Sequence, residues 1–127
     1  MQTDVTGTFL CMKHFGRLMI AQRHGKVINL ASMAGQVALQ DCRLGAYDVS
    51  KAAIEALTRC MAGEWAQHGI QVNAIAPGYF LTDINRRFIQ DNPAFYERSL
   101  GRIPLARWGD PDEIGALAVF LASHASD

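Results

Sequence analysis

Two short apolar runs with a long helical segment between them dominate the pattern of hydrophobic and polar positions. Residues 26–30 and 70–76 have the length and composition of buried strands. Between them, apolar residues recur at helical spacing across residues 46–67. The members of this stripe are Ala52, Ala53, Ile54, Leu57, Met61 and Trp65. The order strand, helix, strand predicts a βαβ unit with parallel strands and a right-handed crossover.

A second helix is expected before the first strand, over residues 1–24. Its apolar positions on one face are Val5, Phe9, Met12, Leu18 and Met19. His24-Gly25 ends it, and His68-Gly69 ends the later helix in the same way. We expect Gly25 to supply the positive φ that a helix C-terminus often needs.

The segment after the βαβ unit has a different character. Residues 79–109 are rich in aromatic residues and arginines, and Asn92-Pro93 indicates a helix start inside them. We interpret this segment as a lid over a site. Asp110, Pro111 and Glu113 then form an N-cap, a first-turn proline and an acid three residues after the cap, which predicts a helix through Leu121.

Two strands are too few for a stable parallel sheet, because such sheets have several strands and are covered on both faces. The chain is therefore expected to be a single partial domain, 1–127. Strands are expected to be missing on its N-terminal side and at its C-terminus.

Composition narrows the classes of function. The chain has 127 residues, half of them hydrophobic, and a formal net charge of zero. A packed core is therefore possible, and no charge excess favours nucleic acid or an anionic membrane surface. The apolar run 116–122 is far shorter than a membrane span. The first residues also lack the layout of a signal peptide.

Cysteine and histidine usage points away from disulfides and metals. Cys11, Cys42 and Cys60 are odd in number and widely spaced, which suits reduced, buried or partly buried thiols in a cytoplasmic protein. The four histidines have no metal-ligand spacing with each other or with cysteine. We expect His24 and His68 to be surface or capping residues.

Polar residues gather where the predicted strands end. In an open α/β sheet, ligands bind beyond the carboxyl ends of the strands. Ser32 follows the first strand, Pro77-Gly78 follows the second, and Tyr47 starts the helix that leaves the same edge. The sequence therefore predicts a site at this edge.

Tyr47 and Lys51 are four residues apart and so share one face of a helix. Tyrosine in water has a pKa of about 10, too high for a base near neutrality. A lysine ammonium one turn away, and the positive end of the helix, both favour the phenolate. Such a pair can exchange a proton with an alcohol or carbonyl, and Ser32 can hold the reacting oxygen. Alone, Tyr-x-x-x-Lys is also compatible with ordinary helix surface.

Four motifs together resemble the short-chain dehydrogenase/reductase family over nearly the whole chain. They are residues 27–35 (VINLASMAG), 46–53 (AYDVSKAA), 72–78 (VNAIAPG) and 103–109 (IPLARWG). The resemblance implies a doubly wound, Rossmann-like α/β fold with a parallel sheet. It also implies reversible oxidation of a secondary alcohol to a ketone with NAD or NADP as the cofactor.

The resemblance also implies residue roles. Tyr47 would be the acid/base, Lys51 would favour its phenolate and bind the nicotinamide ribose, and Ser32 would orient the substrate oxygen. The implied cofactor-binding set is Tyr47, Lys51, Pro77, Gly78, Phe80 and Thr82. Family members commonly pair through the two long helices, here residues 3–23 and 46–67, which implies a homodimer or homotetramer.

Several features depart from the family pattern. The glycine-rich phosphate loop and the ribose-selecting residue lie on strands that this chain lacks, so NAD and NADP are not distinguished. The loop after Ser32 is about two residues longer than usual, which leaves Cys42 and Arg43 unassigned. Asp4 stands where the family usually has an asparagine of a proton relay. It is either a relay member or a plain helix-start residue.

The sequence of the segment interpreted as a lid indicates the class of substrate. Its sequence is more similar to sugar, polyol or sugar-acid dehydrogenases than to carrier-protein ketoacyl reductases. Four of its arginines form either a solvated face or a contact to an anionic substrate: Arg86, Arg87, Arg98 and Arg102. The alternative to an enzyme is a non-catalytic fragment or assembly module that keeps the helix-pairing surface and has no dinucleotide site.

Overall fold

A two-stranded parallel sheet lies at the centre of the computed structural model, which describes residues 1–38 and 44–127. Strand β1 (Gly25–Leu30) pairs with β2 (Ile70–Ile75) in parallel, with Val27 opposite Val72. Helix α2 (Gly45–Trp65) connects them, which confirms the predicted strand-helix-strand order. Cys42 and Arg43 lie outside the described residues.

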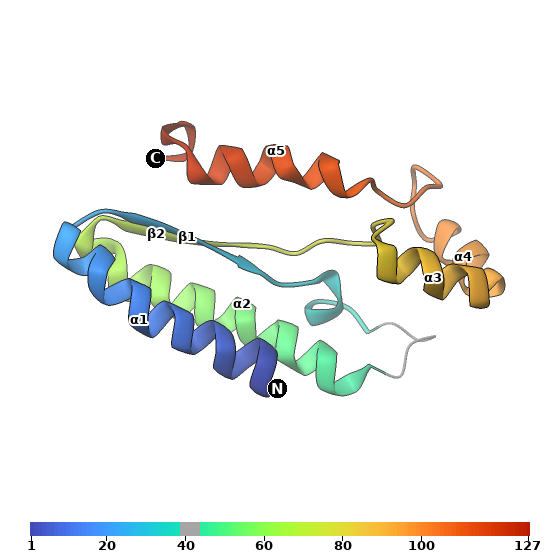
Figure 1. Ribbon diagram of the computed structural model, residues 1–127, viewed down its shortest axis with the longest axis horizontal. Coiled ribbons are helices and arrows are strands. Elements are labelled where there is room, and N and C mark those ends of the chain that lie inside the picture. Colours follow the sequence, from blue (N-terminus) through green and yellow to red (C-terminus); the bar gives the residue numbers. More distant parts are fainter. Residues whose placement is uncertain (39–43) are drawn as a thin grey trace.

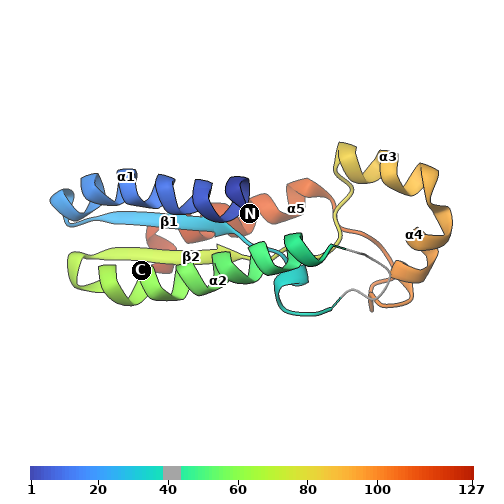
Figure 2. The same cartoon turned by 90° about the horizontal axis from the view of Figure 1, so that it is seen from below.

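Helices cover both faces of the sheet. Helix α1 (Gly7–Gln22), which follows a π-helical turn at Gln2–Thr6, lies with α2 on one face, and α5 (Pro111–Ala122) lies on the other (Figures 1 and 2). Helices α3 (Asp83–Asp91) and α4 (Pro93–Leu100) lie beyond the carboxyl ends of the strands. Short 3-10 turns complete the described structure at Met33–Gly35, Ala66–His68 and His124–Ser126.

The core lies between the sheet and the pair α1 and α2. Its buried members are Met12, Trp65, Ile70 and Val72, and partly buried side chains of both helices pack around them. A fully buried aliphatic side chain contributes about 1.5–3 kcal/mol relative to an exposed one. This cluster therefore holds α1 and the carboxyl half of α2 against the strands.

The capping signals are confirmed in part. The Asp110 side chain accepts from the Asp112 amide at 3.0 Å, and Glu113 accepts from the Asp110 amide at 2.7 Å, as a capping box requires. Gly69 has φ 71, the left-handed conformation that glycine adopts without strain. The expectation for Gly25 is wrong, because the residue with positive φ is Arg23, at 53°, and Gly25 already belongs to β1.

Two further expectations about burial are wrong. Cys11 and Cys60 are exposed, not packed. Cys11 lines an open hollow between α1 and β1, whereas its neighbour Met12 enters the core. Phe9 and Leu18 are also exposed, at 46% and 60%, because α1 contacts the strands through a narrower stripe.

The lid contains more helix than its sequence predicts. The helix start at Asn92-Pro93 is confirmed by α4, whereas α3 has no counterpart among the expected elements. Thr82 begins α3, and its hydroxyl accepts from the Asn85 amide at 3.4 Å. In the described part of the chain, no helix is long and apolar enough to cross a bilayer.

Candidate active site

Ser32 stands at the start of the short turn that follows β1. Its backbone is extended, and its Oγ accepts a hydrogen bond from the Ala34 amide at 3.2 Å. The next amide, that of Met33, donates to the Pro77 carbonyl at 3.0 Å. The ends of both strands are therefore joined by a backbone hydrogen bond immediately beside Ser32.

This turn packs directly on α2. A Cβ atom placed on Gly35 would lie 2.7 Å from the Ala52 nitrogen and 2.8 Å from the Lys51 carbonyl carbon. Real Cβ atoms essentially never come closer than 3.0 Å. Only glycine permits this approach, which brings the turn that begins at Ser32 against the backbone of Lys51.

Tyr47 and Lys51 occupy successive turns at the amino end of α2. Tyr47 is 39% exposed, whereas Lys51 is 9% exposed. The Lys51 Nζ lies 5.5 Å from the centroid of the Tyr47 ring. A cation in that position is attracted to the aromatic face.

Two further groups hold the Lys51 ammonium. It donates to the Leu30 carbonyl at 3.1 Å, and its Nζ lies 3.4 Å from the Asp4 Oδ1. Leu30 ends β1, so this bond ties the lysine to the strand that carries Ser32 two residues later. Burial of a charged amine is costly unless it is paired and hydrogen-bonded, and both conditions are met here.

Asp4 belongs to the same cluster. The buried Ser50 hydroxyl lies 3.0 Å from the Asp4 Oδ2 and 2.7 Å from the Tyr47 carbonyl oxygen. The Ser50 hydrogen bond, assisted by the Lys51 ammonium, lowers the pKa of Asp4 below its ordinary value, while partial burial opposes the shift. The Asp4 carboxylate therefore contacts both Ser50 and Lys51. Sequence reasoning did not include Ser50, although it lies between Tyr47 and Lys51.

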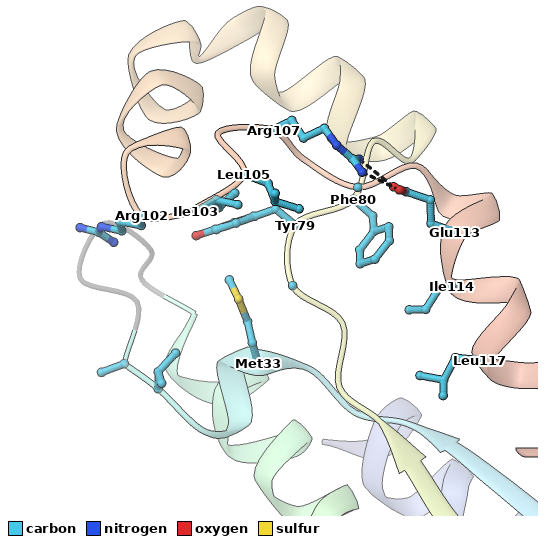
Figure 3. Close-up of a pocket in the computed structure, with 14 residues that line it drawn as sticks. Met33, Tyr79, Phe80, Arg102, Ile103, Leu105, Arg107, Glu113, Ile114 and Leu117 are labelled. Carbon is cyan, nitrogen blue, oxygen red and sulfur yellow. Dashed lines mark hydrogen bonds and ion pairs between the residues drawn. The ribbon is translucent and has the colours of Figure 1, made fainter. Parts of the chain in front are cut away.

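A cavity of about 780 Å³ lies between the strand ends and the lid (Figure 3). Ser32, Tyr47 and Lys51 do not line it, but Met33 and Gly78 do. Phe80 also lines the cavity, and its main chain pairs with Gly109 at the base of the lid. Among the candidate cofactor residues, Gly78 and Phe80 therefore face the cavity, while Pro77 holds the turn and Thr82 caps α3.

The lid is held by a cluster of aromatic rings and one hydroxyl. The Trp108 indole stacks on Tyr79 with ring centroids 4.8 Å apart, and its Nε1 donates to the Ser99 Oγ at 2.7 Å. Trp108 and Ser99 are both buried. At the α5 end of the cavity, Arg107 makes two bonds to Glu113, at 2.8 and 2.6 Å. In the described ranges, no three His, Cys, Asp or Glu side chains gather as a metal site requires.

Comparison with known proteins identifies the family of the chain. A family model described as enoyl-(acyl carrier protein) reductase matches residues 1–127. The chain belongs to the short-chain dehydrogenase/reductase family. It is 46% identical to 2-dehydro-3-deoxy-D-gluconate 5-dehydrogenase of Bacillus subtilis, covering 100% of this chain and 49% of that protein.

Two solved structures are similar. Gluconate 5-dehydrogenase from Burkholderia cenocepacia, in complex with NADP and tartrate, has a TM-score of 0.91 and 40% identity, covering 99% of this chain and 48% of that one. An NAD+-bound xylitol dehydrogenase has a TM-score of 0.89 and 34% identity, covering 97% and 52%. The Rossmann-like fold class is thus confirmed for this part of the family fold. The chain spans about half the length of the relatives that it matches.

Proposed function

We propose that the full-length protein containing this chain interconverts a secondary alcohol and a ketone with NAD or NADP. The substrate is a small polyol, sugar or sugar acid, the classes named for the similar proteins. The observation that carries the proposal is the placement of Lys51. Its ammonium lies against the Tyr47 ring and is bonded to the end of the strand that leads to Ser32.

Tyr47 acts as the acid/base. In the oxidation direction its phenolate takes the hydroxyl proton of the alcohol, and in reduction the phenol returns that proton to the carbonyl oxygen. Lys51 stabilises the phenolate by its charge, and the Ser32 hydroxyl orients the reacting oxygen. The nicotinamide, when bound, supplies or accepts the hydride.

The nicotinamide half of a cofactor site fits the described residues. The cavity beside the strand ends has Gly78 and Phe80 in its wall, and a Cβ on Gly78 would meet only the Met33 sulfur, at 3.6 Å. The backbone there is open to a flat ring. We propose that Pro77, Gly78, Phe80 and Thr82 border the nicotinamide, and that Tyr47 and Lys51 bind its ribose hydroxyls.

The decisive variant is Tyr47→Phe in the full-length protein. Loss of the acid/base is expected to lower kcat by about 100- to 10,000-fold, while the dissociation constant for the cofactor changes little. Tyr96→Phe is the matched control, because Tyr96 lies in the lid and its ring packs on Trp108. Equal turnover of wild type and Tyr47→Phe would exclude Tyr47 as the acid/base.

Asp4 has a positioning role in this proposal. An ionised carboxylate only accepts hydrogen bonds, so Asp4 holds the Lys51 ammonium and accepts from Ser50 or from a water in a relay. Asp4→Asn keeps the side-chain shape and removes the charge, and the pH–rate profile is expected to shift. Asp83→Asn, at the exposed start of α3, is the control. A profile unaltered by Asp4→Asn would leave Asp4 as a helix-start residue.

The non-catalytic fragment or assembly module is the second hypothesis for the 127-residue chain, which spans about half the length of its relatives. Titration of the isolated chain with NADH, followed by fluorescence, distinguishes the enzyme hypothesis from the non-catalytic module. Micromolar binding would exclude an inert module, and no binding by a chain that is folded by circular dichroism would favour it.

We also propose a homodimer or homotetramer that forms through α1 and α2. Support comes from large apolar side chains that α1 leaves exposed away from β1: Phe9, Leu10 and Leu18. Exposed apolar surface of this kind often marks an interface. Sedimentation of wild type and Leu18→Glu measures it, and a wild-type monomer would contradict it. The cytoplasmic localisation stays a prediction from cysteine usage.

A further inference from the structure

Ser50 carries a fully buried hydroxyl at the amino end of α2, one residue before Lys51. Its residue is 0% exposed, whereas its helix neighbour Val49 is 58% exposed. A buried polar group without a hydrogen bond costs free energy, so the partners of this hydroxyl define what it does. The function proposed above gives chemical roles to Tyr47 and Lys51, on the same two turns of α2, and none to Ser50.

The Ser50 hydroxyl has one proton and two acceptors within reach. Its Oγ lies 2.7 Å from the Tyr47 carbonyl oxygen and 3.0 Å from the Asp4 Oδ2. A bond to a carbonyl one turn earlier is common for a serine in a helix and needs no other element. The contact to Asp4 is different, because it joins α2 to the π-helical turn Gln2–Thr6. Ser50 therefore connects the Asp4 carboxylate to the backbone of Tyr47.

The two oxygens of Asp4 have different partners. Oδ2 meets Ser50, and Oδ1 lies 3.4 Å from the Lys51 Nζ. A direct bond from an ammonium to a carboxylate is about 2.7–2.9 Å long, so the contact of Asp4 with Lys51 is loose. The Ser50 hydrogen bond is the largest cause of the lowered pKa of Asp4. Among the described residues, the charged groups that lower it further are Lys51 and, more weakly, the amino group of Met1.

A second lysine–aspartate pair shows the geometry of a direct contact in this chain. The Lys26 Nζ lies 2.6 Å from the Asp127 Oδ1, and hydrogen bonding to Lys26 is the largest cause that lowers the pKa of Asp127 to about 2. The other oxygen of Asp127 also has a partner, His124, but that side chain is 89% exposed and can follow the carboxylate. Ser50 is enclosed in a close-packed interior and cannot follow Asp4 in this way.

We propose that Ser50 is a positioning residue that keeps the Asp4 carboxylate from closing on the Lys51 ammonium. The proposal rests on the function proposed above and adds a residue to it. With the carboxylate held by Ser50, the ammonium donates to the Leu30 carbonyl of β1 at 3.1 Å and lies 5.5 Å from the centroid of the Tyr47 ring. A tight ion pair with Asp4 would offset the charge through which Lys51 stabilises the phenolate in that function.

The test is Ser50→Ala in the full-length protein. Without the hydroxyl, Asp4 can approach Lys51, and the phenolate of Tyr47 loses part of its stabilisation. We expect the acid limb of the pH–rate profile for alcohol oxidation to move to higher pH by about 0.5–1 unit. Ultraviolet difference titration between each protein and the same protein with Tyr47→Phe should show an equal shift in the midpoint of phenolate formation, without turnover.

Two further variants make the test specific. Ser50→Cys keeps a similar volume and replaces the hydroxyl by a weak donor, so it should move the profile in the same direction even if the alanine variant does not fold. Thr58→Val is the matched control, because Thr58 is another buried hydroxyl of α2. It donates to the Ile54 carbonyl at 2.8 Å and accepts from the Asn29 side chain at 2.9 Å. Its loss is expected to lower stability and to leave the pH profile in place.

Combination with Asp4→Asn shows whether the effect of Ser50 passes through the carboxylate. Asparagine has no charge to bring towards Lys51. Adding Ser50→Ala to Asp4→Asn should therefore move the profile no further than Asp4→Asn alone, so the two changes should be non-additive.

Three outcomes would overturn the proposal. An unchanged profile in both Ser50 variants would leave the serine as a packing residue. A shift to lower pH would mean that Asp4 does not close on Lys51 when the hydroxyl is removed. The full shift in the Asp4→Asn background would mean that Ser50 acts on α2 without Asp4. Failure of the proposed function looks different, because turnover would then persist in Tyr47→Phe, whereas the phenolate titration still tests Ser50.

Discussion

The strand ends and the lid face the same cavity but are held together by different kinds of contact. At the strand ends, main-chain oxygens fix the site: Leu30 accepts from Lys51, and Pro77 accepts from Met33. In the lid, side chains provide the prominent links, through the Trp108–Ser99 bond and the Arg107–Glu113 pair. The contrast is one of degree, because Asp4 also holds Lys51 through its side chain and main-chain bonds also join residues 79–81 to Gly109.

This difference suits the strand ends and the lid to different roles in the proposed function. A carbonyl oxygen is present whatever the residue type, so the bond from Lys51 to Leu30 and the bond from Met33 to Pro77 do not depend on the side chains at positions 30 and 77. The lid contacts need particular side chains, and a single substitution can reshape them. The strand ends are thus suited to fixed chemistry, and the lid is suited to varied substrate choice.

The largest loss of stability is expected where the turn after Ser32 meets α2, because the two backbones come closest there. Gly35→Ala puts a Cβ 2.7 Å from the Ala52 nitrogen, and this overpacking should lower the free energy of unfolding by up to about 3 kcal/mol. Turnover should fall as well, because the turn after Ser32 is pushed away from α2. Urea denaturation and initial rates of the full-length protein measure both.

Gly101→Ala is the matched change in the lid. The atom nearest to the added Cβ is 3.5 Å away, and the backbone of Gly101 is helical, with φ −62°. The free energy of unfolding should therefore change by less than about 1 kcal/mol. If the two alanine variants lose stability equally, the strand ends are no more tightly packed than the lid.

The next effect concerns the lid alone. Ser99→Ala leaves the indole N–H of Trp108 without its hydrogen-bond acceptor, which should cost about 1–2 kcal/mol. We expect substrate KM to rise more than kcat falls, since Lys51 and Tyr47 keep their contacts. Combining Ser99→Ala with Trp108→Phe tests the coupling in a double-mutant cycle. Fully additive losses would contradict a functional Ser99–Trp108 bond.

The smallest predicted effect is on the pH dependence of stability. Hydrogen bonding to Arg107 lowers the pKa of Glu113 from 4.5 to about 2. A lowered folded-state pKa stabilises the protein above pH 4.5, and this stability is lost as the pH falls from 4.5 towards 2. The urea midpoint of wild type should therefore fall more steeply in this range than that of Glu113→Gln. The difference should be small, because the pair is exposed and screened by salt; parallel curves would indicate that the pair contributes nothing.

Much of the scaffold could be predicted from local pattern. The strands, the helix between them, the α5 capping box and the α4 start depend on residues close together in the chain. The burial of a side chain depends on its neighbours in space, and the pattern did not predict it: Leu18 is exposed, and Cys11 lines an open hollow beside β1. The positive φ at Arg23 instead of Gly25 is a shift of two residues at a helix end, where boundaries are least certain.

For the proposed site, the sequence alone predicts which residues carry the chemistry. Ser32, Tyr47 and Lys51 follow from their types and from the element ends they occupy, because a strand end and a helix start are local features. Only the tertiary structure placed Asp4, 47 positions before Lys51, within 3.4 Å of it and paired Arg107 with Glu113. Those contacts depend on how α1, α2 and the lid pack across the sheet, and packing brings together residues whose separation along the chain contains no such information.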